Sequence, residues 1–225
     1  MNAVILGDRS DIMQEMIPLM ERDGWNVYGW HRGQKRFCYP WDLVIVAIGS
    51  VAPVGSWHSI DDGLWELAIE SNMLLPVRLL RSMWRLAAPN ASVCFMAGAN
   101  PNKPMKKYSA YSVGKMALLK ACEHLDLESS DCKFFALAPG VVLTKIHRAT
   151  DEAGIRNERL ERARRDGGVP MARIYSCLRW CIRQEKSVVG GRNICVSDSE
   201  DWDIETHLQE KLLANPSMFK LRRQA

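Results

Sequence analysis

The chain has 225 residues, of which 47% are hydrophobic and 25% are charged, values typical of a folded globular protein. This length favours a single domain spanning residues 1–225, with a core that needs no disulfide bonds. The net charge of +4 is too small to favour nucleic acid as the main partner. No apolar run is long enough to span a membrane, and the charged start excludes a secretory signal, so we expect a cytoplasmic protein.

The seven cysteines are scattered, and several lie within apolar runs. This pattern predicts reduced, buried thiols rather than a disulfide framework. Cys177 and Cys181 are one helical turn apart and in principle share a metal ion. No further ligands occur at a suitable spacing, so we expect core packing and no metal site.

Apolar runs and helical spacing alternate along the chain. Short runs predict buried strands at 3–6, 25–30, 43–47, 92–96, 133–137 and 193–196. Amphipathic spacing predicts helices over 8–23, 63–86 and 109–127. The alternation predicts an α/β fold with a doubly wound parallel sheet. The segment 31–41 is too short for a full crossover, so we expect a loop there, with at most an edge strand at 36–38.

Glycines recur where these strands end, at Gly7, Gly49, Gly98 and Gly140. Ligands of such sheets bind beyond the carboxyl ends of the strands, where glycine lets the backbone approach closely. The pattern therefore indicates a nucleotide site, although glycine also ends strands simply to form turns.

Tyr111 and Lys115 are four residues apart and share one face of the predicted helix. A nearby ammonium group favours the phenolate and lowers the pKa of a tyrosine, which then exchanges protons with a carbonyl oxygen. The alternative is an ordinary amphipathic helix with a packed tyrosine and a solvated lysine.

The ordered set of motifs resembles the classical short-chain dehydrogenase/reductase family from the first strand to the last, which implies a Rossmann-type sheet. The matching stretches are 7–12, 47–49, 70–73, 108–115 and 139–144. Further stretches at 97–100, 167–170, 201–202 and 221–223 are similar to a divergent subgroup associated with bacterial polysaccharide or nucleotide-sugar gene clusters.

The resemblance implies hydride transfer between a nicotinamide cofactor and a ketone or secondary alcohol, with a nucleotide sugar or acyl thioester as possible substrate. It assigns Tyr111 as general acid/base, Lys115 to the nicotinamide ribose and Asn72 to a water relay. Arg32, just after the second strand, favours NADP(H) over NAD(H), unless it is only a surface charge. The implied cofactor-binding residues are Gly7, Arg9, Ser10, Asp11, Ile12, Arg32, Ala47, Gly49, Tyr111, Lys115, Pro139, Gly140, Val142 and Thr144.

The sequence departs from the family at two functional positions. Gly98 stands thirteen residues before Tyr111, where the family has its catalytic serine. Gly98 and Asn100 are then candidate substrate contacts, with Asn100, a water or a substrate hydroxyl as the replacement donor. Asp11 and Met13 replace two glycines of the phosphate turn, and Asp11 either repels the pyrophosphate or caps the helix.

Two further segments remain open to interpretation. Residues 144–168, called the lid here, resemble the family's substrate lid and precede a C-terminal extension at about 198–225. The basic side chains of the lid favour an anionic substrate or merely solvate a helix. Apolar side chains over 65–84 favour a homodimer or homotetramer or serve only the core. The rival functions are a non-catalytic dinucleotide-binding or scaffold protein and a subunit supporting an active homologue.

Overall fold

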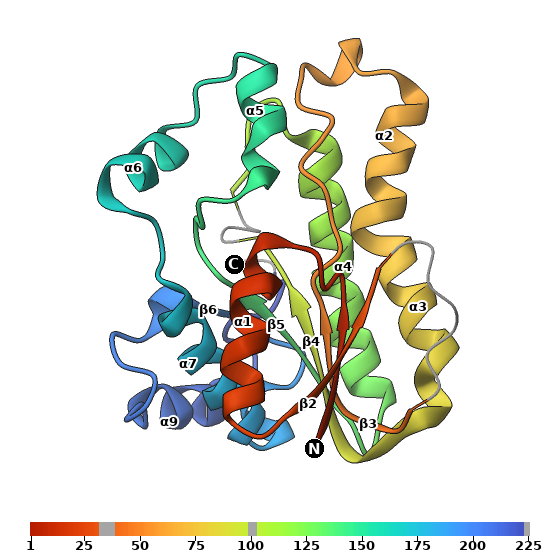
Figure 1. Cartoon of the computed structure of the whole chain (residues 1–225), viewed down its shortest axis with the longest axis vertical. Coiled ribbons are helices and arrows are strands. Elements are labelled where there is room, and N and C mark those ends of the chain that lie inside the picture. Colours follow the sequence, from red (N-terminus) through yellow and green to blue (C-terminus); the bar gives the residue numbers. More distant parts are fainter. Residues whose placement is uncertain (32–38, 99–102, 223–225) are drawn as a thin grey trace.

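The computed structural model describes residues 1–31, 39–98 and 103–222. Its six strands form one parallel sheet in the order β2-β1-β3-β4-β5-β6 within this described part (Figure 1). The strands are β1 (Asn2–Leu6), β2 (Asn26–Trp30), β3 (Trp41–Val46), β4 (Ala87–Met96), β5 (Lys133–Ala138) and β6 (Asn193–Cys195). The predicted doubly wound parallel sheet is confirmed. The edge strand predicted at 36–38 falls outside the described residues.

Successive side chains of the strands point to opposite faces of the sheet, and each face has its own hydrophobic core. One face of the sheet packs Ile5, Ile45 and Phe135 against α1 (Asp11–Arg22) and α7 (Met171–Arg183). The helices α8 (Lys186–Val189) and α9 (His207–Ala214) extend this layer. The cysteines 94, 177 and 181 are buried in it as free thiols, and within the described residues no group of three or more potential metal ligands occurs.

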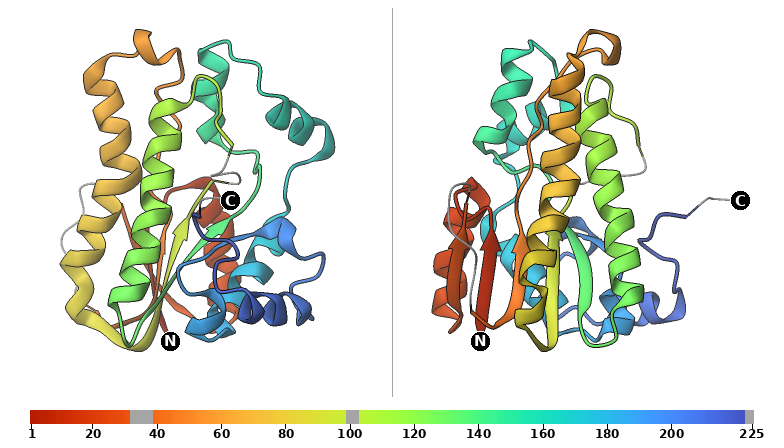
Figure 2. Two further views of the ribbon diagram at one scale, coloured as in Figure 1. Left: turned by 180° about the vertical axis from the view of Figure 1, so that it is seen from behind. Right: turned by 90° about the vertical axis from the view of Figure 1, so that its right-hand side faces the viewer.

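The other face packs Val44, Phe95 and Phe134 against α3 (Leu75–Met83) and α4 (Ser109–Glu128). The single helix predicted over 63–86 consists of α2 (Asp62–Ile69), a π-helical turn (Glu70–Leu74), α3 and a 3₁₀ turn (Trp84–Leu86). Figure 2 shows this compound helix running beside α4. The π turn matters for the site, because it carries Asn72.

The lid contains a 3₁₀ turn (Lys145–His147), α5 (Arg148–Glu152) and α6 (Glu158–Asp166), which rise above the carboxyl ends of the strands (Figure 1). Two further 3₁₀ turns occur at Trp57–Ser59 and Val196–Asp198. Asn157 caps α6 by accepting the backbone N–H groups of Arg159 and Leu160. Within the described ranges, no helix is long and apolar enough to cross a membrane.

The close contact between α4 and the π turn depends on Gly114. A Cβ atom added there would lie 2.9 Å from the Cβ of Asn72. We expect Gly114→Ala to lower the free energy of unfolding by about 1–2 kcal/mol, because the clash outweighs the gain in helix propensity. Chemical denaturation measures this, with His124→Ala on the exposed side of α4 as the control. A Gly114→Ala protein as stable as the wild type would contradict the expected tight contact.

Candidate active site

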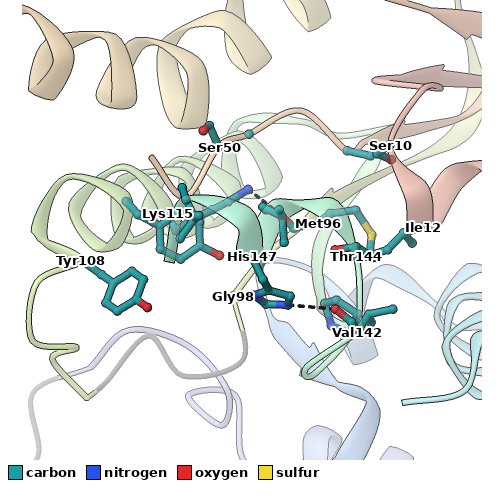
Figure 3. A pocket seen from close by; sticks show the side chains of 18 of the residues that line it. Ser10, Ile12, Ser50, Met96, Gly98, Tyr108, Lys115, Val142, Thr144 and His147 are labelled. Carbon is teal, nitrogen blue, oxygen red and sulfur yellow. Dashed lines mark hydrogen bonds between the residues drawn. The ribbon is translucent and has the colours of Figure 1, made fainter. Parts of the chain in front are cut away.

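A cavity of about 1100 Å³ lies at the carboxyl ends of β1, β3, β4 and β5, beneath the lid. Figure 3 shows side chains entering it from opposite sides, with Ser10 and Ile12 facing Tyr108 and Lys115. This is the edge of the sheet at which ligands of open α/β folds bind.

The first wall is the turn between β1 and α1. Gly7 has a φ of +97°, and a Cβ atom there would lie 2.9 Å from the carbonyl oxygen of Ala47. The turn is closed by the Gly7 N–H, which donates to the Trp30 carbonyl at 2.8 Å. The Ser10 hydroxyl accepts the N–H of Met13 and caps α1. This cradle of backbone beside a capped helix N-terminus fits the diphosphate of a dinucleotide.

Asp11 does not cap α1, because Ser10 occupies that role. Its carboxylate accepts the backbone N–H of Lys145 at 2.6 Å and pairs with the Lys145 ammonium at 2.6 Å. The hydrogen bonds and charge of Lys145 lower the pKa of Asp11. The carboxylate therefore stays ionised and joins the turn to the lid.

A carboxylate from the turn after β1 lies beside the end of β2, and sequence reasoning missed it. Asp8 extends beside β2, and an added Cβ at Gly29 would overlap its carboxyl group. His31 Nδ1 lies 3.2 Å from an Asp8 carboxyl oxygen. No acidic residue ends β2 in the sequence, but the turn after β1 supplies Asp8, 22 positions before Trp30. Arg32, predicted to bind a 2′-phosphate, lies outside the described residues.

The catalytic candidates come from α4 and β4. A Cβ atom added at Gly98 would lie 3.2 Å from the Tyr111 hydroxyl oxygen. The position of the missing serine is thus directly beside the tyrosine, as the spacing predicted. The Lys115 ammonium donates to the Met96 carbonyl at 2.9 Å (Figure 3). It also donates to the Ile48 carbonyl at 3.5 Å.

The lowered pKa that the sequence predicted for Tyr111 is wrong, because burial outweighs the effect of the nearby ammonium group. Loss of hydration raises the pKa of Tyr111 above its usual value and lowers the pKa of Lys115 to about 8. In both cases the charged form is the one disfavoured. With a pKa of about 8, Lys115 nevertheless remains mostly protonated at pH 7.

Asn72 supports this pair from behind. Its side chain is fully buried, donates to the carbonyls of Ser50 at 2.8 Å and Ala68 at 2.9 Å, and accepts the Ser50 N–H at 3.2 Å. A Cβ atom added at Gly49 would lie 2.6 Å from Asn72 Oδ1 and 3.1 Å from Lys115 Nζ. Any larger residue at Gly49 would therefore displace Asn72 or Lys115.

A polar cluster between α4 and the lid was not predicted. The buried Tyr108 hydroxyl donates to the buried Thr150 hydroxyl at 3.0 Å and accepts from Asn157 Nδ2 at 3.4 Å. All three residues line the cavity. The one feature of the sequence that could have drawn attention to this cluster is Asn157, which stands at the N-cap position before a charged helix. His147 Nε2 also contacts the Val142 carbonyl at 2.9 Å and fixes the start of the lid (Figure 3).

Most predicted site residues meet at the cavity. Those that line it are Gly7, Arg9, Ser10, Asp11, Ile12, Ala47, Gly49, Gly98, Tyr111, Lys115, Pro139, Gly140, Val142 and Thr144. Asn72 lies behind this wall rather than in it. Asn100, like Arg32, belongs to a part of the chain that the structure leaves undescribed.

The basic residues of the lid divide into two groups. Arg164 pairs with Asp151 and Glu161 within the lid, as expected if the basic residues only solvate a helix. Arg148 and Arg159 line the cavity, as does Lys103 before α4. These three cations leave the anionic-substrate interpretation open.

The sequence matches no protein-family model and no curated protein. Solved structures nevertheless share the fold. A short-chain dehydrogenase/reductase from Saccharomyces cerevisiae superposes with a TM-score of 0.73 at 17% identity, over 88% of this chain and 96% of that one. A small-chain dehydrogenase in complex with NADPH gives 0.73 at 19% identity, over 86% and 95%. An actinorhodin polyketide ketoreductase with NADPH gives 0.71 at 16% identity, over 87% and 95%.

The low pKa of Lys115 predicts a pH-dependent stability. Below about pH 8 the folded state carries a poorly hydrated ammonium, whereas between pH 8 and 10.5 only the unfolded chain keeps that proton. Stability contributed by Lys115 therefore rises with pH in this window. Relative to Lys115→Met, we expect the wild type to gain about 1–3 kcal/mol between pH 8 and 10.5.

Urea denaturation of both proteins across this pH range measures the difference. Tyr111 titrates in both, so its contribution largely cancels. A difference in unfolding free energy that does not change with pH would contradict the assigned pKa shift.

Proposed function

We propose that this protein is an NAD(P)-dependent oxidoreductase that moves a hydride between a nicotinamide and a ketone or secondary alcohol. The observation that carries the proposal is the placement of Tyr111, Lys115 and Asn72 around one cavity that also exposes the capped N-terminus of α1. A tyrosine, a lysine and a phosphate cradle in one cavity suit carbonyl reduction better than simple binding.

The dinucleotide, when bound, supplies or accepts the hydride. The Tyr111 hydroxyl would donate its proton to the carbonyl oxygen of the substrate, or accept one from an alcohol. Lys115 uses two of its three N–H donors on Met96 and Ile48, which leaves one for a ribose hydroxyl. Its positive charge would favour the Tyr111 phenolate. Asn72 would hold the 48–50 segment and hence the lysine.

The absence of a serine side chain at position 98 leaves the developing alkoxide with one donor fewer. A substrate hydroxyl or a water would complete its hydrogen bonds. This observation also favours a second candidate, a non-catalytic dinucleotide-binding or scaffold protein with the same fold. Asp11 in the phosphate turn favours that candidate too, whereas the retained Tyr111 and Lys115 oppose it.

For the cofactor we propose NADP(H), on the presence of Arg32 and the NADPH bound to two similar structures. Asp8 weighs in the other direction, because a carboxylate at the end of β2 suits a ribose diol and repels a 2′-phosphate. Lys103, Arg148 and Arg159 at the cavity wall support a ketone substrate that carries an anionic group, such as a nucleotide sugar or an acyl thioester.

We further propose a homodimer or homotetramer formed through α2 and α4. Both helices expose large apolar side chains on the surface away from the sheet, among them Leu64, Leu67 and Val113. Trp65 and Met83, part of the apolar set that suggested association, are instead half-buried and buried.

Calorimetric titration with NADPH and with NADH tests the proposal. We expect micromolar binding of one form or both, and reduction of ketones by the loaded protein. Tyr111→Phe should bind the cofactor equally well and reduce ketones about 10²–10⁴-fold more slowly, because only the proton donor is lost. Folded protein that binds neither cofactor contradicts the proposal. Cofactor binding without any ketone reduction in a broad screen would favour the non-catalytic candidate.

The serine position offers a gain-of-function test. Gly98→Ser places a hydroxyl beside Tyr111, and we expect kcat for simple ketones to rise about tenfold or more, given that one such donor contributes about 10²–10³ elsewhere. Gly98→Ala adds the same Cβ without the hydroxyl and should not raise the rate. Equal rates in the two variants would mean that the hydroxyl is not the limiting feature.

A further inference from the structure

The segment that opens the lid is tied to the phosphate turn by a single lysine. Lys145 donates its backbone N–H to Asp11, pairs its ammonium with the same carboxylate, and donates from the ammonium to the Arg9 carbonyl at 3.0 Å. These residues lie 134 and 136 positions apart in the chain. Both Asp11 and Lys145 line the main cavity, and both also line a smaller cavity of about 480 Å³ beside the lid.

The N-terminus of α1 and Lys145 together form an anion-binding site, and the Asp11 carboxylate occupies it. Asp11 is the first residue of α1, where the helix dipole and free N–H groups favour negative charge. Its carboxylate is held by Lys145, and Arg148 adds further positive charge. A pyrophosphate in the adjacent cradle would bring about two more negative charges close to Asp11.

On this basis, and resting on the function proposed above, we propose that Lys145 is a phosphate-binding residue for the dinucleotide. Asp11 holds its ammonium in place of the pyrophosphate, and the cofactor takes the ammonium over on binding. The start of the lid thereby changes partner, from Asp11 to the cofactor. Asp11 weakens cofactor binding, because its carboxylate competes with the pyrophosphate for the Lys145 ammonium.

The exposure of the pair makes such an exchange feasible. The side chains of Lys145 and Asp11 are 56% and 32% exposed, so their ion pair is screened by water and weak. A charge-assisted bond from an ammonium to a phosphate is stronger. Lys145 is also better placed than Arg148, since its ammonium already touches the backbone of the turn at Arg9.

Two isosteric variants separate this role from a structural ion pair. A structural pair is broken by either substitution, so both Asp11→Asn and Lys145→Met would weaken dinucleotide binding. If Lys145 instead moves from Asp11 to the cofactor, the two substitutions change the cofactor affinity in opposite directions. We expect Lys145→Met to weaken the affinity for NADPH, or for NADH if that form binds, about tenfold, and Asp11→Asn to tighten it about threefold or more. Calorimetric titration at two salt concentrations measures both, and the wild type should lose more affinity with salt than Lys145→Met.

The matched control is Arg164→Met, which removes another lid cation whose partners, Asp151 and Glu161, lie within the lid. We expect it to leave the cofactor affinity unchanged, and an equal loss in this variant would mean that Lys145 acts only by stabilising the lid. A second readout is amide hydrogen exchange at Lys145, whose N–H is bonded to Asp11. In the wild type, cofactor should lower its protection, because the start of the lid leaves Asp11; unchanged protection would contradict the exchange.

The outcomes distinguish this inference from the proposed function. If the wild type binds a dinucleotide but both variants shift the affinity in the same direction, or neither shifts it, Lys145 is not a phosphate-binding residue and the proposed function stands. If the wild type binds no dinucleotide, both fail.

Discussion

The fully buried amide of Asn72 is the constraint on which the site depends. A buried amide must satisfy its donors and acceptor inside the protein, and Asn72 does so with Ser50 and Ala68. Those bonds fix the loop after β3 against the compound helix. The same residue sits where the helix widens into a π turn and where Gly114 lets α4 come close. The positions of Lys115 and Tyr111 on α4 follow from that contact.

The strands and three of the helices were predictable from local pattern. Continuous apolar runs placed the buried strands, although β4 begins at Ala87 rather than at 92, and helical spacing placed α1, the compound helix and α4, whereas α7 was not predicted. The glycines at the strand ends placed the cavity, because parallel strands bring their carboxyl ends to one edge. Tyr111, Lys115 and Gly98 came together there as their spacing indicated.

The remaining features depend on partners distant in the sequence, and no local pattern contains them. Asp11 looked like a helix cap or a source of repulsion, since its partner Lys145 lies far along the chain, in the 3₁₀ turn that opens the lid. Asp8 reaches the end of β2 only because Gly29 has no side chain to exclude it. Nothing in the sequence around Tyr108 indicated a partner for its side chain, yet its hydroxyl bonds to Thr150 in the lid. The helical spacing over 63–86 likewise gives no sign of the π turn at Glu70–Leu74.

The two cores on opposite faces of the sheet have a consequence for how this sequence can change over time. The layer containing α1 and α7 shapes the phosphate cradle, and the layer containing α3 and α4 carries the tyrosine and lysine. Because the side chains of the two layers are separated by the sheet, substitutions in one layer combine almost additively with those in the other. Each layer also tolerates apolar exchanges that conserve volume. Two layers that accept such exchanges independently are consistent with a shared fold at only 17% identity to a similar structure.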